Sequence, residues 1–337
     1  MNFSVHKIQT ENGINYLNIF LMLLSCFFAF FIPFHLFLFV YAVMGPLHYL
    51  TEISWLEKRN FFVPVKRDVL VYSIVCVLLF GGIFIPRIAD FTTSMIAFAV
   101  IFTLIIVLIK NNIIKYIAIA VTLIIIAASF KDSLLVQKNN LLPIVIFSIL
   151  FPTIIHVYVF TGIFLAGGAL KQKLFSGYLS VGVFIACTVI FFLIVPRDLP
   201  TVSNELKHMF DKFRMMNKAL MYVFGMNDYK TVKDIWIQKE ETIYNSPYAF
   251  AVMRFIAFAY CYHYLNWFSK TSVIKWHDVS KTRMLLIIFL WIVSVGLYAW
   301  NYNVGFYALF ILSMLHVFFE FPLNLISIKN LFTTTKR

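Results

Sequence analysis

The sequence predicts an all-α protein, a polytopic bundle of about ten transmembrane helices. Of its 337 residues, 61% are hydrophobic and 13% are charged, whereas soluble domains contain about 45–50% apolar and about 25% charged residues. Apolar stretches of about 20 residues recur along the chain, and a helix of that length spans the hydrocarbon of a bilayer. These observations predict one transmembrane domain, residues 1–337, surrounded by the lipid bilayer.

Ten apolar segments mark the predicted helices in order. Pro33 is expected to mark the turn between the first two, because proline interrupts a helix. The four cysteines fall inside apolar segments and form no CxxC pair, so neither a disulfide framework nor a zinc site is predicted. The helices are predicted at residues 16–33, 35–56, 69–86, 91–109, 113–130, 141–167, 176–195, 247–268, 284–300 and 304–327.

Basic residues in the short loops predict the orientation, because the side richer in Lys and Arg faces the cytoplasm. The side that includes both termini holds 16 of them, and the other side holds Arg87, Lys131 and Lys138. Both termini are therefore predicted in the cytoplasm, with the protein in a plasma membrane such as a bacterial inner membrane. Because these loops carry much of the net charge of +13, nucleic acid is not an expected partner. The 16 residues are Lys7, Lys58, Arg59, Lys66, Arg67, Lys110, Lys115, Lys171, Lys173, Lys270, Lys275, Lys281, Arg283, Lys329, Lys336 and Arg337.

One long polar segment, residues 197–246, is predicted on the external side. Apolar residues recur in it at helical spacing, with basic residues between them. This pattern predicts an amphipathic helix that lies on the outer leaflet. A lid over a substrate site is the alternative. The apolar positions are Leu206, Met209, Phe210, Phe213, Met216, Leu220 and Val223, and the basic ones are Lys207, Lys212, Arg214 and Lys218.

Four of the eight histidines lie inside apolar segments, where an ionisable side chain is costly and indicates function. They belong to the second, sixth, eighth and tenth predicted helices, which all run from the outside to the cytoplasm. Their distances from the cytoplasmic helix ends allow one shared layer in the inner half of the membrane. Glu52 and Glu320 each follow one of them by four residues, on the same helix face. The four are His48, His156, His263 and His316.

This set of side chains predicts a metal site. Imidazole is the commonest protein ligand for transition metals, and four imidazoles suit iron, copper or zinc. Glu52 and Glu320 either orient the ligands or bind metal themselves, which would give a dinuclear centre. For each histidine alone, the simpler interpretation is a hydrogen bond to a neighbouring helix. Arg254 lies nine residues before His263 on the opposite helix face, so we expect it to extend outward rather than join the site.

Four short motifs surround these histidines. They are Gly45-Pro46-Leu47-His48 with Glu52, Ile154-Ile155-His156, Cys261-Tyr262-His263 with Phe268, and Leu315-His316 with Glu320. In this order they resemble the motifs of the Brp/Blh-type β-carotene dioxygenases, multi-helix membrane proteins that cleave β-carotene to retinal with histidine-bound iron. Two positions depart from the family pattern: Phe160 stands where the second motif has an acid, and Trp267 stands where the third has another histidine.

The resemblance implies a membrane-embedded oxygenase. Non-haem iron would be held by the four histidines, Glu52 and Glu320 would serve the catalytic site by orienting them, and dioxygen would be the co-substrate. The substrate would be lipid-soluble, most concretely a carotenoid. Two other functions fit the sequence. A transporter, or a polymerase acting on lipid-linked glycans, would use Arg197, Arg214 and Lys218 of the external segment. A bis-histidine haem electron carrier would use the same histidines as axial pairs.

Overall fold

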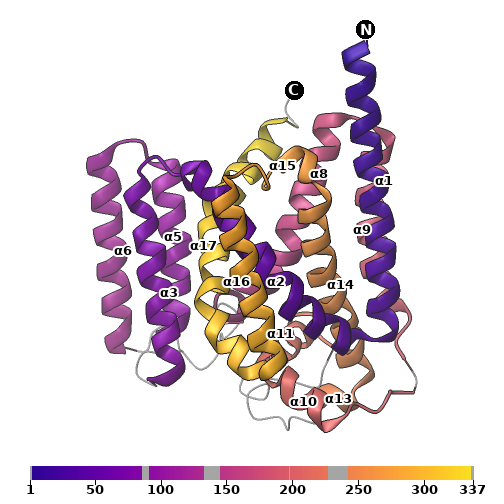
Figure 1. The fold of residues 1–337 in the computed structure, drawn as a ribbon. Coiled ribbons are helices and arrows are strands. Elements are labelled where there is room, and N and C mark those ends of the chain that lie inside the picture. The colour runs from indigo at the N-terminus through magenta and orange to yellow at the C-terminus, as the bar shows by residue number, and fades with distance from the viewer. Residues whose placement is uncertain (1, 86–90, 133–144, 197, 227–241, 335–337) are drawn as a thin grey trace.

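The computed structural model describes residues 2–85, 91–132, 145–196, 198–226 and 242–334, and these residues form helices and no strand (Figure 1). Seven helices are long and apolar enough to cross a membrane. At this level the predicted all-α membrane fold is confirmed. The seven are α1 (Asn2–Phe31), α2 (Pro33–Lys58), α3 (Val69–Phe84, with the short η2, Lys66–Asp68, before it), the continuous pair η4 (Val145–Phe160) and α8 (Thr161–Gln172), α9 (Phe175–Leu193), α16 (Lys281–Trp300) and α17 (Tyr302–Thr334).

Three further helices coincide with predicted spans. α5 (Thr92–Leu108) and α6 (Asn112–Asp132) are apolar and stand beside α3 at one edge of the bundle (Figure 1). α14 (Pro247–Ser269) is long enough to span but carries arginine, histidine, asparagine and several tyrosines. Residues 141–144 of the sixth predicted helix lie outside the described residues.

The break between α1 and α2 occurs where the sequence predicts it. Ile32 has a non-helical backbone, with φ −131° and ψ 51°, and Pro33 is the first residue of α2. Proline suits that position because its fixed φ is helical and the N–H that it lacks would have no partner there. The chain therefore reverses direction at this proline, and α2 brings its histidine back into the bundle.

α14 lies at the centre of the bundle. Every side chain from Ala249 to Tyr264 is buried, and the helix contacts α1, α2, α9, η4 and α11 (Arg214–Val223). Since this helix meets protein on all sides, its polar residues find partners instead of lipid tails. Its position explains how a segment with low hydropathy belongs to a membrane bundle.

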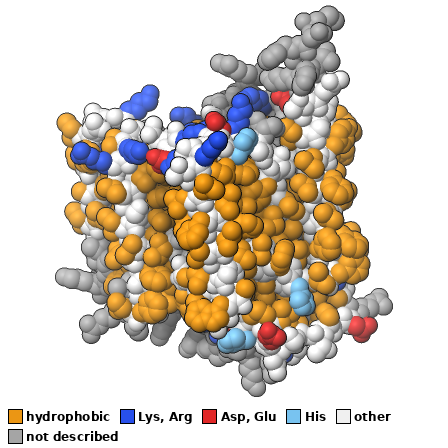
Figure 2. Space-filling view, viewed as in Figure 1, with side chains coloured by type: hydrophobic (Ala, Val, Ile, Leu, Met, Phe, Trp, Pro, Cys, Tyr) orange, Lys and Arg blue, Asp and Glu red, His pale blue; other side chains and the backbone are white. Residues whose placement is uncertain are grey.

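The two ends of the bundle differ in charge. α1 begins and α17 ends at the same end, which also holds α15 (Thr271–Ile274), whereas α10 (Asn204–Phe210) and α13 (Thr242–Asn245) lie at the opposite end (Figure 1). In Figure 2, Lys and Arg side chains gather along the first end, and hydrophobic side chains cover the height of the molecule below them. Among the described residues, α1 therefore begins and α17 ends at the end where basic side chains gather on this face.

The segment 197–246 packs against protein. Its described part forms α10, the short η5 (Asp211–Phe213), α11 and α13. The ring of Phe210 lies 5.0 Å from that of Phe34, and the ring of Phe213 lies 4.8 Å from that of Phe37. The predicted amphipathic pattern is present, but its apolar face covers the end of the bundle instead of a lipid leaflet. Arg197 lies outside the described residues.

Arg254 also differs from its prediction. Its guanidinium does not extend outward but donates hydrogen bonds to the carbonyl oxygens of Phe30 and Ile194, both at 2.9 Å. These carbonyls belong to the ends of α1 and α9, where the last helical C=O groups have no partner within their own helix. Arg254 therefore fastens the ends of two helices to α14.

Candidate metal centre

Four helices bring the predicted histidines together. His48 comes from α2, His156 from η4, His263 from α14 and His316 from α17, and none is more than 8% exposed. The separations of neighbouring ring centroids, His48–His263, His48–His316, His156–His263 and His156–His316, are 4.8, 5.5, 5.3 and 5.1 Å. The sequence predicted that these residues share one layer, and the structure places all four in one cluster.

Two donor atoms lie close to Nε2 of His48. Nε2 of His263 lies 3.1 Å from it, and Oε2 of Glu52 also lies 3.1 Å from it. Two nitrogens that bind one ion at about 2.0–2.1 Å lie roughly 3 Å apart when the angle between them is near tetrahedral or smaller. The spacing of these atoms is therefore the spacing of ligands that share an ion, and it makes Glu52 a candidate ligand.

Thr161 fixes which nitrogen of His263 faces the cluster. The Thr161 hydroxyl donates its hydrogen to the carbonyl oxygen of Val157 at 2.7 Å, and its Oγ1 lies 2.9 Å from Nδ1 of His263. Since that hydroxyl hydrogen is already used, Thr161 accepts a hydrogen bond from His263 Nδ1–H. The proton on Nδ1 leaves the lone pair on Nε2, the atom that points at His48.

Glu320 takes a different place from Glu52. Its Oε2 lies 3.0 Å from Nδ1 of His156 and accepts a hydrogen bond from the side-chain amide of Asn324 at 3.1 Å. A carboxylate beside Nδ1 of a histidine favours the proton on that nitrogen and leaves Nε2 to a metal. The carboxyl groups of Glu52 and Glu320 are also close enough to interact electrostatically, so both glutamates belong to one cluster.

His316 lies on the other side of His48. Ligand atoms of His48, Glu52 and His316 all lie within 4.8 Å of one another. The ring of Tyr49 stacks on that of His316 with centroids 4.1 Å apart, and the Tyr49 hydroxyl pairs with that of Tyr264 at 3.0 Å. Stacking holds the His316 ring in position without using either of its nitrogens.

The cluster holds more buried donor atoms than hydrogen-bond partners. Nδ1 of His48, Nδ1 of His316 and Nε2 of His156 are buried and have no partner that meets hydrogen-bond geometry. Nδ1 of His156 and Oε2 of Glu52 are buried too, and each has only the ion-pair contact given above. Buried polar atoms in proteins nearly always have a partner, because desolvation without one is costly. Neutral imidazoles and carboxylates are also the donors that iron and other transition metals accept. The residues present therefore fit a metal ion.

Backbone irregularity accompanies three of the histidines. η4 is a π-helix from Val145 to Phe160, which includes Pro152 and His156. Pro46 and Pro322 lie within α2 and α17, close to His48 and Glu320. π-helical turns are frequent at functional sites, and proline opens space between membrane helices. All three irregularities lie close to residues of the cluster.

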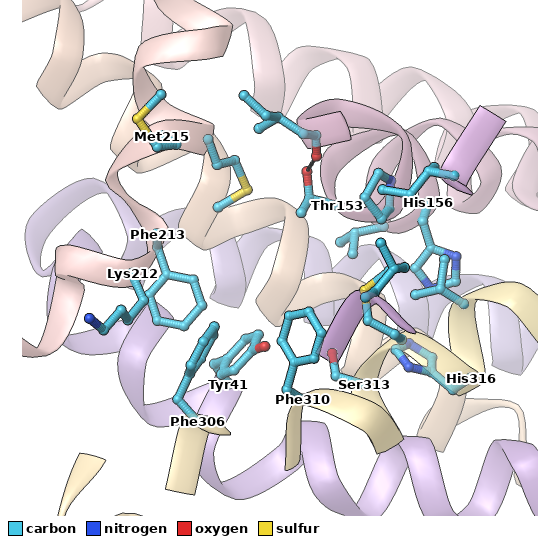
Figure 3. A pocket seen from close by; sticks show the side chains of 18 of the residues that line it. Tyr41, Thr153, His156, Lys212, Phe213, Met215, Phe306, Phe310, Ser313 and His316 are labelled. Atoms are coloured by element: carbon cyan, nitrogen blue, oxygen red, sulfur yellow. Dashed lines mark hydrogen bonds between the residues drawn. The ribbon is translucent and has the colours of Figure 1, made fainter. Parts of the chain in front are cut away.

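A cavity of about 350 Å³ reaches the cluster (Figure 3). His156 and His316 lie at one end of it and Lys212 lies at the other, with Tyr41, Phe306, Phe310 and Ser313 between them. The walls are mainly aromatic and aliphatic, with three methionines. A binding site lined in this way suits an apolar molecule that approaches the histidines end-on.

Sequence reasoning missed the residues that support the histidines. Thr161 and Asn324 are single polar residues on apolar helices, where a hydroxyl or amide commonly bonds its own backbone. The one available signal for Asn324 is its spacing, four residues after Glu320. Thr161 has no such signal, because its partner is 102 residues away.

Comparison with known proteins adds no relative to these observations: no protein-family model, no curated protein and no solved structure matches this chain.

Proposed function

We propose that this protein is a membrane-embedded oxygenase that uses a metal, non-haem iron, on a lipid-soluble substrate. The observation that carries the proposal is the buried cluster of four histidines and two glutamates at the end of an apolar cavity. His48, His156, His263 and His316 would hold the metal, together with Glu52. Bound iron would supply the binding and activation of dioxygen, which ordinary side chains cannot perform.

The protein's own groups position and protect the reaction. Thr161 accepts the Nδ1–H of His263, and the carboxylate of Glu320 beside Nδ1 of His156 would favour a proton there, which would leave Nε2 of both rings to the metal. The apolar walls exclude water, which limits side reactions of a reactive centre. A molecule in the cavity would have one end beside His156 and His316, the two side chains that Figure 3 draws at that end of the cavity.

The resemblance to Brp/Blh-type dioxygenases supports carotenoid cleavage as the most concrete form of this function. It rests on the four motifs alone, since the supporting residues Thr161 and Asn324 lie outside them. In this proposal both termini lie in the cytoplasm and α10 lies on the external side of a bacterial inner membrane.

The spacing of the rings favours a metal ion over haem. In a bis-histidine haem the two imidazoles lie on opposite faces of a planar macrocycle, so their ligand nitrogens are two metal–ligand bonds apart in a straight line and their ring centroids are farther apart still. Nε2 of His48 and of His263 lie 3.1 Å apart, and the ring centroids of His156 and His316 lie 5.1 Å apart. No macrocycle fits between rings at these distances.

The polymerase and transporter alternatives gain no support from the external segment. Arg214 is paired with Asp211 at 2.9 Å, and Lys218 is only 3% exposed. Neither residue presents an open charged surface to a hydrophilic substrate. Both therefore behave as parts of the cap that the segment forms over the bundle.

Metal content tests the proposal directly. Purified protein should contain iron in stoichiometric amount and show no haem absorption. His156→Ala should lose most of that iron, whereas His208→Ala, at an exposed position on α10, should keep it.

In a carotene-producing bacterium the native chain should bleach the cells and yield retinal or a shorter apocarotenoid, and His156→Ala should not. If the native protein contained no transition metal, the proposal of a metal-dependent oxygenase would be wrong.

A further inference from the structure

A second cavity, of about 590 Å³, lies between α1, α8, α9 and the end of α14. Among the described residues, none lines both this cavity and the one that reaches the histidines. It lies where α8 ends at Gln172 and α9 begins at Phe175, and these are the ends of two membrane-crossing spans. In a bilayer the cavity would therefore lie at the level of the lipid headgroups.

Lys270 places a positive charge in this cavity without a carboxylate to balance it. Its side chain belongs to the lining and is only partly exposed. Burial alone lowers the pKa of its ammonium to about 8, because a cation away from water and without an anion beside it is costly. Glu11 is the one carboxylate of the described lining, against two lysines, and no described carboxylate forms an ion pair with Lys270. An anionic ligand would supply that partner.

Hydrogen bonds orient a side-chain amide at the same place. Asn15 donates through Nδ2 to Oε1 of Gln172 at 2.9 Å and to Oγ of Ser176 at 3.0 Å. Because the oxygen of the Gln172 amide accepts from Asn15, its nitrogen keeps both N–H groups for another acceptor. Gln172 lines the cavity together with Lys171, an exposed lysine one residue earlier. The cavity thus offers ammonium and amide donors, the groups that bind phosphate.

The other walls of the cavity are apolar. They include Phe164 and Leu165 of α8. Close to them, Gly168 leaves space open, because a Cβ atom built there would meet no atom within 4 Å. The flanking helices α1 and α9 expose large hydrophobic side chains near the cavity, with Leu17 44% and Tyr178 48% exposed. A ligand that suits both parts of this lining has a charged head and an apolar tail, and it can arrive from the surrounding lipid.

We propose that this cavity binds an anionic phospholipid, with the headgroup phosphate at Lys270 and Gln172 and an acyl chain along Phe164 and Leu165. Basic pockets between membrane helices bind anionic lipid headgroups in this way. The bound lipid would contact α1, α8, α9 and α14 together, and so would help to hold the helix that carries His263. The inference does not depend on the proposed oxygenase function, because no residue of the histidine cluster lines this cavity.

Lipid binding to the purified protein tests this inference. The full chain is delipidated in a non-ionic detergent and titrated with dioleoylphosphatidylglycerol, and native mass spectrometry counts the lipids bound per chain. We expect one tightly bound phosphatidylglycerol. Dioleoylphosphatidylcholine, whose choline group balances the phosphate charge, should bind at least about tenfold more weakly. Excess inorganic phosphate should not displace the phosphatidylglycerol, because phosphate has no acyl chain. Displacement by phosphate would mean that the site takes a free anion, and the lipid assignment would be wrong.

Two variants act on the site in different ways. Lys270→Met removes the cation, so it should lower the affinity for phosphatidylglycerol about tenfold and leave that for phosphatidylcholine unchanged. Lys270→Arg keeps the charge and should retain most of the native affinity. Gly168→Leu keeps every charge but fills the open space beside the apolar wall. It should weaken the binding of both lipids at least about tenfold.

Each variant has a matched control. Lys173→Met removes an exposed lysine close to Gln172 but outside the described lining, and Gly182→Leu adds the same side chain at an exposed position of α9 where a Cβ atom also meets nothing. Both controls should bind phosphatidylglycerol like the native protein. Equal native affinity for the two lipids, native-like phosphatidylglycerol binding by Lys270→Met or by Gly168→Leu, or an equal loss in the controls would overturn the inference.

Discussion

Thr161 accepts a hydrogen bond from Nδ1 of His263 while it donates its own hydroxyl hydrogen to the backbone one turn earlier. Both contacts are buried within the bundle. Together they determine the tautomer of His263, and thereby which nitrogen is available to a metal. A residue that never touches the ion thus decides whether one of its ligands is ready to bind.

Thr161→Val should weaken metal binding about 10–100-fold, because His263 loses the acceptor that holds its Nδ1 proton. Valine has nearly the same shape, so helix content and insertion should not change. Competition against a chromogenic chelator measures the affinity. Thr161→Ser keeps the hydroxyl and should bind metal like the native protein. Native-like metal affinity in Thr161→Val would show that the hydrogen bond does not matter.

The two glutamates should differ in their effect on metal affinity. Glu52 lies beside Nε2 of His48, where a ligand belongs, whereas Glu320 lies beside Nδ1 of His156, on the side away from a metal bound at Nε2. We expect Glu52→Gln to lower the affinity by more than about 100-fold and Glu320→Gln by about 10–100-fold. The same chelator competition applies, with the exposed Glu205→Gln as control. A larger loss in Glu320→Gln would reverse the two roles.

Arg254→Met should destabilise the bundle by about 2–5 kcal/mol, because it leaves the carbonyls of Phe30 and Ile194 without a donor. Arg254→Lys should recover part of that loss, since an ammonium reaches one carbonyl more readily than two. Denaturation of the detergent-solubilised protein measures the change. Arg67→Met, at an exposed position, should stay within about 0.5 kcal/mol of the native protein. A native-like Arg254→Met would show that the two helix ends need no clamp.

The basic end of the bundle should face the cytoplasm. Glu205→Cys on α10 should react with a membrane-impermeant maleimide added to intact cells, and Lys329→Cys near the end of α17 should react only after permeabilisation. Both positions are exposed, whereas the four native cysteines lie within the bundle and should stay largely unlabelled. The reverse labelling pattern would invert the orientation and move the histidine layer to the outer half of the membrane.

The sequence was sufficient to identify the ionisable residues of the site, because an ionisable side chain in an apolar segment costs free energy and so indicates function. Each of the four histidines could be identified in this way. The shared direction of their helices then predicted that they meet. Glu52 and Glu320 followed from their spacing to a histidine on the same helix. Each of these inferences is local.

The remaining features depend on packing between distant segments. Nothing in the sequence pairs Thr161 with His263, or Arg254 with the ends of α1 and α9, because a hydrogen bond across the bundle leaves no periodic pattern. The amphipathic pattern of the segment 197–246 identified an apolar face but could not distinguish lipid from protein as the surface it covers. The cavity and the single lysine of its described lining likewise arise only when seven elements, α2, α3, α5, η4, α14, α17 and the segment 197–246, surround one space.

The central position of α14 has a consequence for how the protein is made. The segment that emerges from the ribosome as residues 247–269 carries Arg254, His263 and Asn266, and each polar side chain weighs against release into lipid on its own. The helices that surround it, α1, α2, α9 and η4, are all synthesised earlier. These helices can be inserted first, so that α14 packs against protein instead of lipid when it enters the membrane. In this order the polar helix α14 is inserted only after four of the helices that it contacts are present.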